Sequence, residues 1–274
     1  MVSRPFFVKA APNPMRLDGK TIIVTGSTTG IGKAIAKAAI AEGANVLIHG
    51  LEPDLGEQAI EDLNPDRSQV SLCILDLTTD GAPKQLIQTA IDEFGKFDAL
   101  VNNAAWVGTG NINDTDEAKF EMAMAINAKA PFFLIKAAIP QLAAQKGSVL
   151  NIGSVNANCG EAELLPYSMS KGALQTMTRN LGDTLHREHG IRVNQINPGW
   201  VLTENEQARK HEQGMDEDWP SALPSMFAPS SRIFAPEEIA AAAVYFLSNE
   251  SGPISGSILE IEQYPMIGRN PPKC

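Results

Sequence analysis

Short apolar runs alternate with longer amphipathic stretches along most of the chain. The short runs are rich in β-branched residues and predict strands over 21–25, 45–49, 70–75, 99–101, 148–152, 192–196 and 257–261. Between them, apolar residues recur at helical spacing and predict helices over 31–42, 82–94, 116–144, 168–188 and 236–247. Such alternation favours right-handed βαβ crossovers, and therefore an α/β fold with a doubly wound sheet of about seven parallel strands and helices on both faces.

Two segments lie outside this alternation. Residues 1–14 mix Pro, Lys, Arg and a few aromatics without periodicity, which predicts a flexible N-terminal extension. Residues 203–232 are polar and contain prolines, and a long insertion after a strand end is typical of a lid or binding loop. A surface excursion without function fits that insertion equally well. Because no linker or internal repeat divides the rest, we expect a single domain over 15–274.

Composition and charge narrow the class of protein. No stretch reaches the roughly 20 apolar residues of a membrane span, so we expect no membrane partner. Cys73, Cys159 and Cys274 lie far apart with no CxxC pair, which predicts neither disulfides nor a zinc site, and the scattered histidines suggest no other metal. A reducing, cytoplasmic location fits this usage. The formal net charge of -10, without a basic run, argues against nucleic acid as a partner.

A glycine-rich turn follows the first predicted strand directly. It reads Thr25-Gly26-Ser27-Thr28-Thr29-Gly30-Ile31-Gly32 and leads into a helical pattern. Glycines at such a junction let the backbone approach a pyrophosphate, whose charge the helix N-terminus then stabilises. A turn of this kind can also be purely structural, but its place at the end of the first strand favours dinucleotide binding.

Tyr167 and Lys171 are candidates for proton transfer. They stand four residues apart at the start of a predicted helix, which places both side chains on one face. A tyrosine acts as a base near neutral pH only if its pKa of about 10 falls by roughly three units, about 4 kcal/mol, and we expect Lys171 to help lower it. Ser154 follows the strand 148–152 and should face the same crevice. Alone, the pair could belong to a surface helix, and Ser154 could be a cap.

Taken together, these residues resemble the short-chain dehydrogenase/reductase family. The resemblance rests on the glycine-rich turn, Asp76-Leu77, Asn102-Asn103-Ala104-Ala105, Tyr167-Ser168-Met169-Ser170-Lys171 and Asn197-Pro198-Gly199, in the order and at about the spacings of that family. It covers nearly everything from Leu17 to about Ile261. It implies a Rossmann-like fold and an NAD(P)-dependent oxidoreductase that moves a hydride between a nicotinamide cofactor and a secondary alcohol or ketone.

The resemblance also assigns roles to individual residues. It implies a catalytic tetrad of Asn127, Ser154, Tyr167 and Lys171, in which Asn127 holds a water that links Lys171 to solvent. Asparagine disfavours helix interiors, so its place in an apolar helical run hints at function rather than at an exposed polar position. The resemblance also implies that Asn102 and Asp76 flank the adenine side of the cofactor. Besides Tyr167 and Lys171, the implied cofactor contacts are Gly26, Thr28, Thr29, Gly30, Ile31, Asp76, Leu77, Asn103, Ala104, Pro198, Gly199 and Thr203. Asp76 could instead be a turn residue at the strand end.

The choice between NAD and NADP depends on the end of the second strand. An acid there would bind the ribose 2′-hydroxyl, and a nearby arginine would accept a 2′-phosphate. The chain has His49-Gly50-Leu51-Glu52, with neither residue at the usual place, and Glu52 would repel a phosphate. NAD is therefore the preferred cofactor and NADP the alternative. His49 could bond the ribose, although a histidine at a strand end is more often a packed structural residue.

The residues around the crevice mouth suggest the substrate class. Trp106, Trp200 and the polar segment 155–163 are expected to line it, which favours a sugar, polyol or other polar hydroxy compound; Cys159 is interpreted as a small buried packing residue. The family implies a homo-oligomer, a tetramer or dimer, built partly on helices 116–144 and 168–188. One alternative is a catalytically idle dinucleotide sensor or interaction protein. Another is a nucleotide-sugar epimerase or dehydratase, although too little chain follows Ile196 for its usual larger C-terminal domain.

Overall fold

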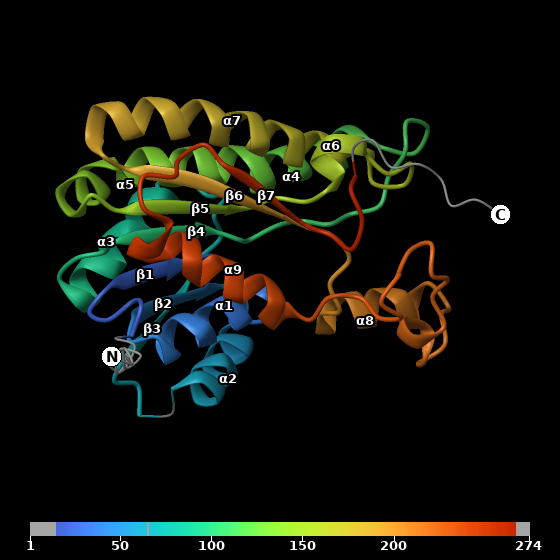
Figure 1. The fold of residues 1–274 in the computed structure, drawn as a ribbon, viewed down its shortest axis with the longest axis horizontal. Helices are drawn as coiled ribbons and strands as arrows, with labels where there is room; N and C mark the ends of the chain where they lie inside the picture. The colour runs from blue at the N-terminus through green and yellow to red at the C-terminus, as the bar shows by residue number, and fades with distance from the viewer. Residues whose placement is uncertain (1–14, 65, 267–274) are drawn as a thin grey trace, which may run out of the picture.

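Seven parallel strands form one sheet in the order β3-β2-β1-β4-β5-β6-β7 (Figure 1). The computed structural model describes residues 15–64 and 66–266, so the predicted extension over 1–14 and the residues from 267 to Cys274 lie outside the described residues. The strands are β1 Thr21–Val24, β2 Asn45–Gly50, β3 Val70–Ile74, β4 Ala99–Asn102, β5 Ser148–Ile152, β6 Arg192–Pro198 and β7 Ile258–Ile261. The predicted doubly wound α/β fold is confirmed.

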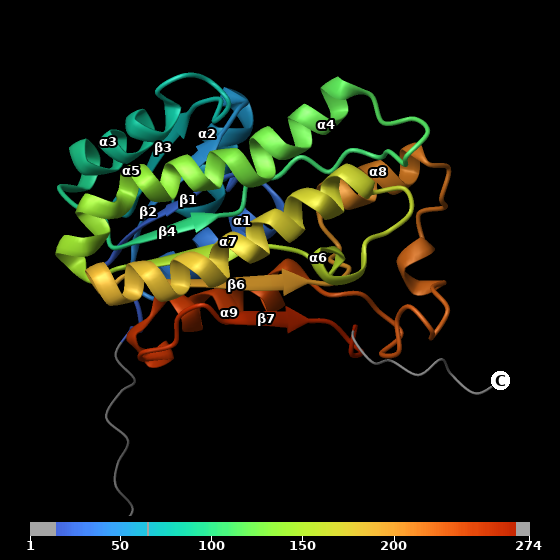
Figure 2. The ribbon, with the colours of Figure 1, turned by 90° about the horizontal axis from the view of Figure 1, so that it is seen from above.

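Helices cover both faces of the sheet, as Figure 2 shows from above. One face carries α1 Gly30–Ala41, α2 Pro53–Leu63 and α9 Pro236–Leu247, and the other carries α3 Ala82–Phe94, α4 Glu117–Met124, α5 Ala130–Gln145 and α7 Leu165–His189. Each face has its own apolar core. Ile22, Val24 and Ile35 are fully buried on the first face, and Ile23, Leu100 and Leu134 on the second. Because successive side chains of a strand point to opposite faces of the sheet, β1 contributes apolar side chains to both cores.

The structure departs from the predicted helices in three places. Helix α2 has no counterpart in the prediction, and its buried side consists of Gly56, Ala59 and Ile60. Short helices α6 Asn156–Cys159 and α8 Glu204–Glu212 lie in segments read as loops. The predicted helix 116–144 is interrupted by a π-helical turn over Ala125–Lys129. Such turns inside α-helices occur frequently at functional sites.

Length and composition alone would let the helical stretch Glu117–Gln145 cross a bilayer, since its most apolar window has a mean hydropathy of 1.4. In the structure its α5 portion lies against the sheet and contacts α3 and α7. A helix at the core of a soluble protein has the same length and composition, so this stretch is weak evidence for a membrane span.

Candidate active site

The strand order places the switch point of the sheet at the carboxyl ends of β1 and β4, and we call the region above these ends the crevice. These two strands are neighbours, and the chain continues from β1 toward β2 on one side and from β4 toward β5 on the other. Ligands of open α/β sheets bind at such a switch point. The glycine-rich turn after β1 and the predicted site residues that follow β4, β5 and β6 therefore meet at the same edge of the sheet.

The glycine-rich turn is shaped by close backbone packing. Gly26 has a φ of +60°, and a Cβ added to it would lie 2.8 Å from Cα of Ala104. A Cβ on Gly32 would lie 2.2 Å from the carbonyl oxygen of Gly26. The Asn103 amide donates to the carbonyl oxygens of Thr25 at 2.9 Å and of Gly26 at 2.8 Å. The Asn103 side chain thus fixes the turn, which leaves its backbone to face a cofactor.

The N-terminus of α1 has the character of an anion site. Within the described chain, the Thr29 side chain does not cap α1, and its first turn holds no acidic residue. Instead, the carboxylate of Glu204 accepts from the backbone N–H of Gly30 at 3.2 Å, and Asn205 donates to the Thr29 hydroxyl at 3.3 Å. An anion thus already lies on this helix end, where the dipole and free N–H groups favour negative charge. The turn and helix fit the pyrophosphate of a dinucleotide.

His49 supports the turn from the second strand. It is 2% exposed; its Nδ1 accepts from the Gly26 N–H at 3.1 Å, and its Nε2 then donates to the Leu75 carbonyl at 2.9 Å. Burial lowers the pKa of this imidazole below its ordinary value. The neutral ring is therefore a packed structural residue, in agreement with the favoured interpretation.

Gly50 and Asp76 lie where the family resemblance places the adenosine of the cofactor, a region we call the adenosine end of the crevice. A Cβ on Gly50 would lie 2.5 Å from Cγ2 of Thr28, so Thr28 fills the space that a side chain at the end of β2 would need. Asp76 accepts from the backbone N–H of Thr78 at 2.8 Å and from its hydroxyl at 2.7 Å, and these hydrogen bonds lower its pKa. Asp76 is thus a turn residue, a role that can coexist with cofactor contact. Asn102 is buried at 3% exposure, and its amide donates into the core to Asn151 at 2.8 Å.

Ser154, Tyr167 and Lys171 come together at the carboxyl end of β5. Ser154 lies close enough to the Tyr167 phenol to act on its pKa, and the Ser154 Oγ accepts from the backbone N–H of Asn156 at 3.1 Å. The ammonium of Lys171 lies 5.6 Å from the centre of the Tyr167 ring and donates to the carbonyl oxygen of Ile152 at 2.7 Å. Because α7 begins at Leu165, phenol and ammonium lie on its first two turns.

The electrostatics of this trio differ from the expectation for Tyr167. Burial raises the pKa of the Tyr167 phenol, with the Ser154 hydrogen bond acting in the opposite direction. Burial also lowers the pKa of Lys171 to about 7. The reason is that Lys171 is 2% exposed and its ammonium donates to a neutral carbonyl, so water no longer stabilises its charge. In the protein alone, the effect of burial thus outweighs that of Ser154, and the Tyr167 pKa lies above its ordinary value. A positive charge near the phenol would act in the opposite direction.

Asn127 lies in the π-helical turn and is 1% exposed. Its Oδ1 accepts from the backbone N–H of Trp106 at 2.8 Å, and its Nδ2 donates to the Trp106 carbonyl at 2.9 Å and to the Ser170 hydroxyl at 2.9 Å. The exposed alternative for Asn127 is therefore wrong. Its side chain joins the segment after β4 to α7, and the water implied by the family resemblance stays a prediction.

The insertion 203–232 begins beside the crevice, at the end to which the strands point (Figure 1). Thr203 caps α8 by accepting from the Glu206 N–H at 3.1 Å, and its methyl group lies 3.3 Å from a Cβ built on Gly30. Glu206 also accepts from Trp200 Nε1 at 2.8 Å and from Arg209. The charges of Arg209 and Glu206 act on Tyr167 with opposite signs. The start of the insertion therefore lies near both the cofactor turn and Tyr167.

The rest of the insertion has an apolar cluster of its own. The rings of Trp200 and Trp219 stack at 5.2 Å, and Trp219, Ala228 and Ile233 are buried together. Gly199 lies close to the C-terminal strand, since a Cβ there would be 2.0 Å from Glu262. At the rim, Cys159 is exposed, so its interpretation as a buried packing residue is wrong. It ends the short helix α6 with its side chain outward.

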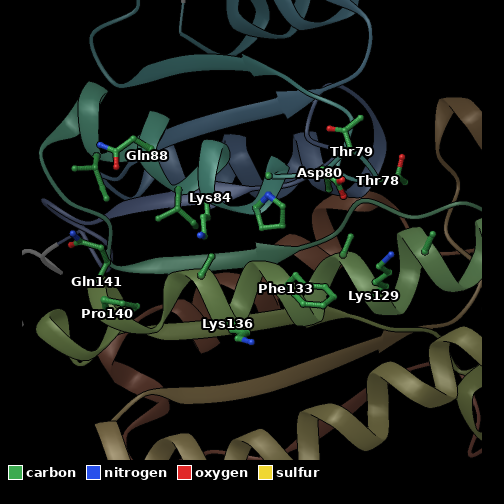
Figure 3. Close-up of a pocket in the computed structure, with 18 residues that line it drawn as sticks. Thr78, Thr79, Asp80, Lys84, Gln88, Lys129, Phe133, Lys136, Pro140 and Gln141 are labelled. Atoms are coloured by element: carbon green, nitrogen blue, oxygen red, sulfur yellow. The ribbon is translucent and has the colours of Figure 1, made fainter.

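A large groove lies away from these residues. A groove of about 1050 Å³ runs between α3 and α5, where Figure 3 shows Lys84 and Gln88 opposite Lys129, Phe133 and Lys136. It shares Leu77 and Thr78 with the adenosine end of the crevice, but none of the four predicted tetrad residues lines it. We therefore place the candidate active site by the convergence of chemistry-bearing side chains rather than by the size of this groove.

A switch-point crevice with a dinucleotide cradle and an adjacent Ser–Tyr–Lys trio defines a Rossmann-type oxidoreductase. A family model described as enoyl-(acyl carrier protein) reductase matches residues 26–263. The chain is 34% identical to an uncharacterized oxidoreductase of Thermotoga maritima over 90% of this chain and 98% of that protein. It is 31% identical to glucose 1-dehydrogenase 2 of Bacillus subtilis (90% and 94% covered) and to galactitol 2-dehydrogenase of Agrobacterium fabrum (86% and 93%). The chain belongs to the short-chain dehydrogenase/reductase family, NAD(P)-dependent oxidoreductases that act on CH–OH groups.

Several contacts of the site were not predicted from the sequence. These are Glu204 and Asn205 on the cofactor turn, and Arg209 with Glu206 beside Tyr167. Glu204 and Gly30 are 174 residues apart, so only the folded chain brings them together. The sequence contains one signal, because an acid directly after the predicted contact Thr203 would lie near the phosphate loop if that contact holds.

Proposed function

We propose that the protein oxidises a secondary alcohol of a sugar, polyol or similar polar hydroxy compound, or reduces the matching ketone, with Asn127, Ser154, Tyr167 and Lys171 as the catalytic group. The observation that carries this proposal is the convergence of two side chains on Tyr167, at the edge of the sheet that the glycine-rich turn shares: the Lys171 ammonium lies 5.6 Å from the ring centre, and Ser154 lies beside the phenol. A sensor that only bound a dinucleotide would have no use for this arrangement.

The mechanism follows from what each side chain can do. A bound nicotinamide dinucleotide would accept or supply the hydride, and its positive ring in the oxidised form adds the charge that favours the Tyr167 phenolate. The Ser154 hydroxyl orients the substrate oxygen, and Tyr167 removes the alcohol proton or returns it. When Lys171 is protonated, its ammonium lies close enough to stabilise the Tyr167 phenolate. Asn127 holds the Trp106 segment beside this centre.

The cofactor we propose is NAD, held at the residues that the family resemblance implies. In NADP enzymes a cation accepts the 2′-phosphate, but residues 27–29 contain no Lys or Arg, and Leu51 and Glu52 follow Gly50. Lys33, on the first turns of α1, already pairs with Asp62 at 2.6 Å. A 2′-phosphate would thus be repelled by the Glu52 carboxylate, and none of the residues named here offers it an unpaired cation.

The rim of the crevice supports a polar, uncharged substrate. Glu161 lies near enough to Tyr167 to raise its pKa, and Glu163 accepts from Asn111 at 3.0 Å. Carboxylates of this kind accept hydrogen bonds from hydroxyl groups and repel anions. Two of the relatives are named as dehydrogenases of glucose and galactitol, which agrees with this class. We further propose that the insertion 203–232 closes over the substrate as a lid.

We also propose that the enzyme works in the cytoplasm as a homodimer or homotetramer. Phe132 and Phe133 on α5 are 45% and 42% exposed, and Met122 and Met169 are similarly open. A groove of about 840 Å³ between α5 and α7 is lined mainly by apolar side chains of the same face. Burying this surface against a second copy would remove apolar area from water.

The test is an assay of nicotinamide reduction at 340 nm with purified protein. Galactitol, D-glucose, other polyols and sugars, hydroxy acids and a steroid alcohol are offered with NAD and, separately, with NADP. We expect turnover of a polyol or sugar with NAD and its loss in Tyr167→Phe. Tight NAD binding without turnover of any compound would refute the proposal and favour the sensor.

A further inference from the structure

A chain of hydrogen-bonded side chains runs beneath the candidate active site, from α7 across β6 and back through α7 to α6 and β7. Its members, which we call the amide chain, are in order Thr178, Gln195, Asn197, Gln175, Asn158 and Glu260. The successive contacts are 2.8, 2.6, 2.6 and 2.9 Å, and the last one joins Asn158 to Glu260. The first three members are fully buried and Gln175 is 7% exposed, whereas Glu260 lies at the surface.

The hydrogen bonds of the amide chain all run in the same direction, from Thr178 toward Glu260. Each amide N–H points toward Glu260, and each amide oxygen points back toward Thr178. A carboxylate can only accept, so Asn158 must offer it an N–H. That choice turns the Asn158 oxygen toward Gln175, and the same reasoning then fixes each amide in turn.

The opposite direction would satisfy the interior equally well. The Thr178 hydroxyl lies 2.8 Å from Gln195 Oε1 and 2.9 Å from the Leu174 carbonyl, and its single proton serves one of them at a time. Its oxygen accepts from Asn151 Nδ2 at 2.8 Å and has a second lone pair for another donor. With that proton on Leu174, Gln195 could donate to Thr178, and every later amide could turn over. The cost would arise only at the end, where an Asn158 oxygen would face a Glu260 oxygen without a proton between them. Glu260 therefore selects between two arrangements.

The amide chain lies directly against the segments that carry the site. Asn197 precedes Pro198, and Asn158 lies on α6, one turn after Ser154. Gly153, the residue before Ser154, packs onto it, since a Cβ there would lie 2.1 Å from Asn197 Oδ1 and 2.3 Å from Gln195 Nε2. A change in the orientation of these amides therefore acts on the backbone that presents Ser154.

We propose that Glu260 is a positioning residue for the reaction: its carboxylate sets the direction of the amide chain and thereby holds α6 and Ser154 in place for the substrate. This inference rests on the proposed function for its consequence in catalysis, but not for its structural part. Glu260 acts through its hydrogen bond with Asn158 and not by direct contact with the reacting groups.

Neutron diffraction from deuterated crystals of the cofactor-free protein tests the structural part. In the wild type, deuterons on Asn158, Gln175 and Asn197 are expected to point toward Glu260. In Glu260→Lys, the introduced ammonium donates to Asn158, and the amides are expected to turn over, with the Thr178 deuteron on the Leu174 carbonyl. Hydrogen exchange of backbone amides 154–160 should become faster in Glu260→Lys and stay at the wild-type rate in Glu61→Lys, an exposed glutamate on α2.

Kinetics with NAD and galactitol, or D-glucose, tests the consequence for catalysis. Glu260→Lys is expected to raise the KM of the alcohol about tenfold, the scale of one charge-assisted hydrogen bond, with an unchanged KM for NAD. Glu260→Asp should recover most of the loss because it keeps the charge. Wild-type amides in the opposite direction, or the same direction and exchange rate in Glu260→Lys, would overturn the proposal. Absence of turnover in the wild type would refute the proposed function and leave the diffraction result to decide on Glu260.

Discussion

Replacing Lys171 by methionine should abolish turnover and yet make the folded protein more stable. Burial lowers the pKa of this side chain from 10.5 to about 7. Such a difference corresponds to a cost of about 4 to 5 kcal/mol for keeping the charged ammonium in the folded protein. Methionine removes that cost but leaves the Ile152 carbonyl without its partner, which costs about 1 to 3 kcal/mol. We therefore expect a net gain of about 2 kcal/mol in the free energy of unfolding at pH 6.

The sign of the pH dependence follows from the direction of the pKa change. Because the folded protein binds the Lys171 proton less tightly than the unfolded chain, the cost is complete below about pH 7. It fades as the pH rises toward 10.5, where the unfolded chain also loses the proton. This residue therefore makes the wild type more stable with rising pH over that window, and the methionine variant should lack this contribution.

Urea unfolding followed by tryptophan fluorescence at pH 6, 8 and 10 measures the effect. Lys136→Met serves as the matched control, because Lys136 is an exposed lysine on α5 and should not reproduce the gain. The advantage of Lys171→Met should be largest at pH 6 and shrink by pH 10. A variant less stable than the wild type at pH 6, with a difference independent of pH, would refute the assignment of Lys171 as a buried and costly charge.

Four further predictions concern the cofactor turn and the α5 surface. Gly32→Ala places a Cβ 2.2 Å from a backbone oxygen, so it should cost about 1 to 3 kcal/mol of stability and remove NAD binding by calorimetry; normal binding would contradict the close packing. Glu204→Gln removes the anion from the N-terminus of α1 and should tighten NAD binding several-fold, whereas unchanged affinity would show that Glu204 does not compete. Burial lowers the pKa of His49, so the stability that this residue contributes is present above pH 6.5 and is lost as the pH falls below that value. In His49→Gln, the free energy of unfolding should therefore fall less steeply between pH 6.5 and lower pH. An unchanged fall would exclude His49 as its source. Phe133→Glu should halve the mass seen by light scattering, and a wild-type mass would place the contact between copies elsewhere.

The sequence predicted the sheet well because strand and helix periods differ and each strand is strongly apolar. All seven predicted strands are present, and α3 and α9 begin and end where the pattern placed them. It missed α2, whose buried side has two small residues, Gly56 and Ala59, beside Ile60, and it placed Cys159 inside although the residue is exposed on α6. Short helices such as α6 and α8 have too few residues for a periodic signal.

For the site, local spacing was informative where chemistry is local. The four-residue spacing of Tyr167 and Lys171 indicates one helix face, and the glycine pattern indicates a tight turn. A long-range contact such as Glu204 on Gly30 cannot be found from local spacing, and its one sequence signal, an acid directly after Thr203, depends on the predicted contact of Thr203 with the cofactor. The pKa of Tyr167 was expected to be lowered, but that expectation did not include the desolvation that the folded crevice imposes.

Transfer of deuterium tests the central claim most directly. The compound of the assay panel with the fastest turnover is prepared with deuterium on its carbinol carbon and incubated with the enzyme and NAD, and the reduced cofactor is analysed by mass spectrometry. We predict that the deuterium appears in the reduced nicotinamide ring with the wild type and that Tyr167→Phe forms almost none. Reduced cofactor without deuterium, or an undiminished rate in Tyr167→Phe, would contradict hydride transfer from a CH–OH group at this site.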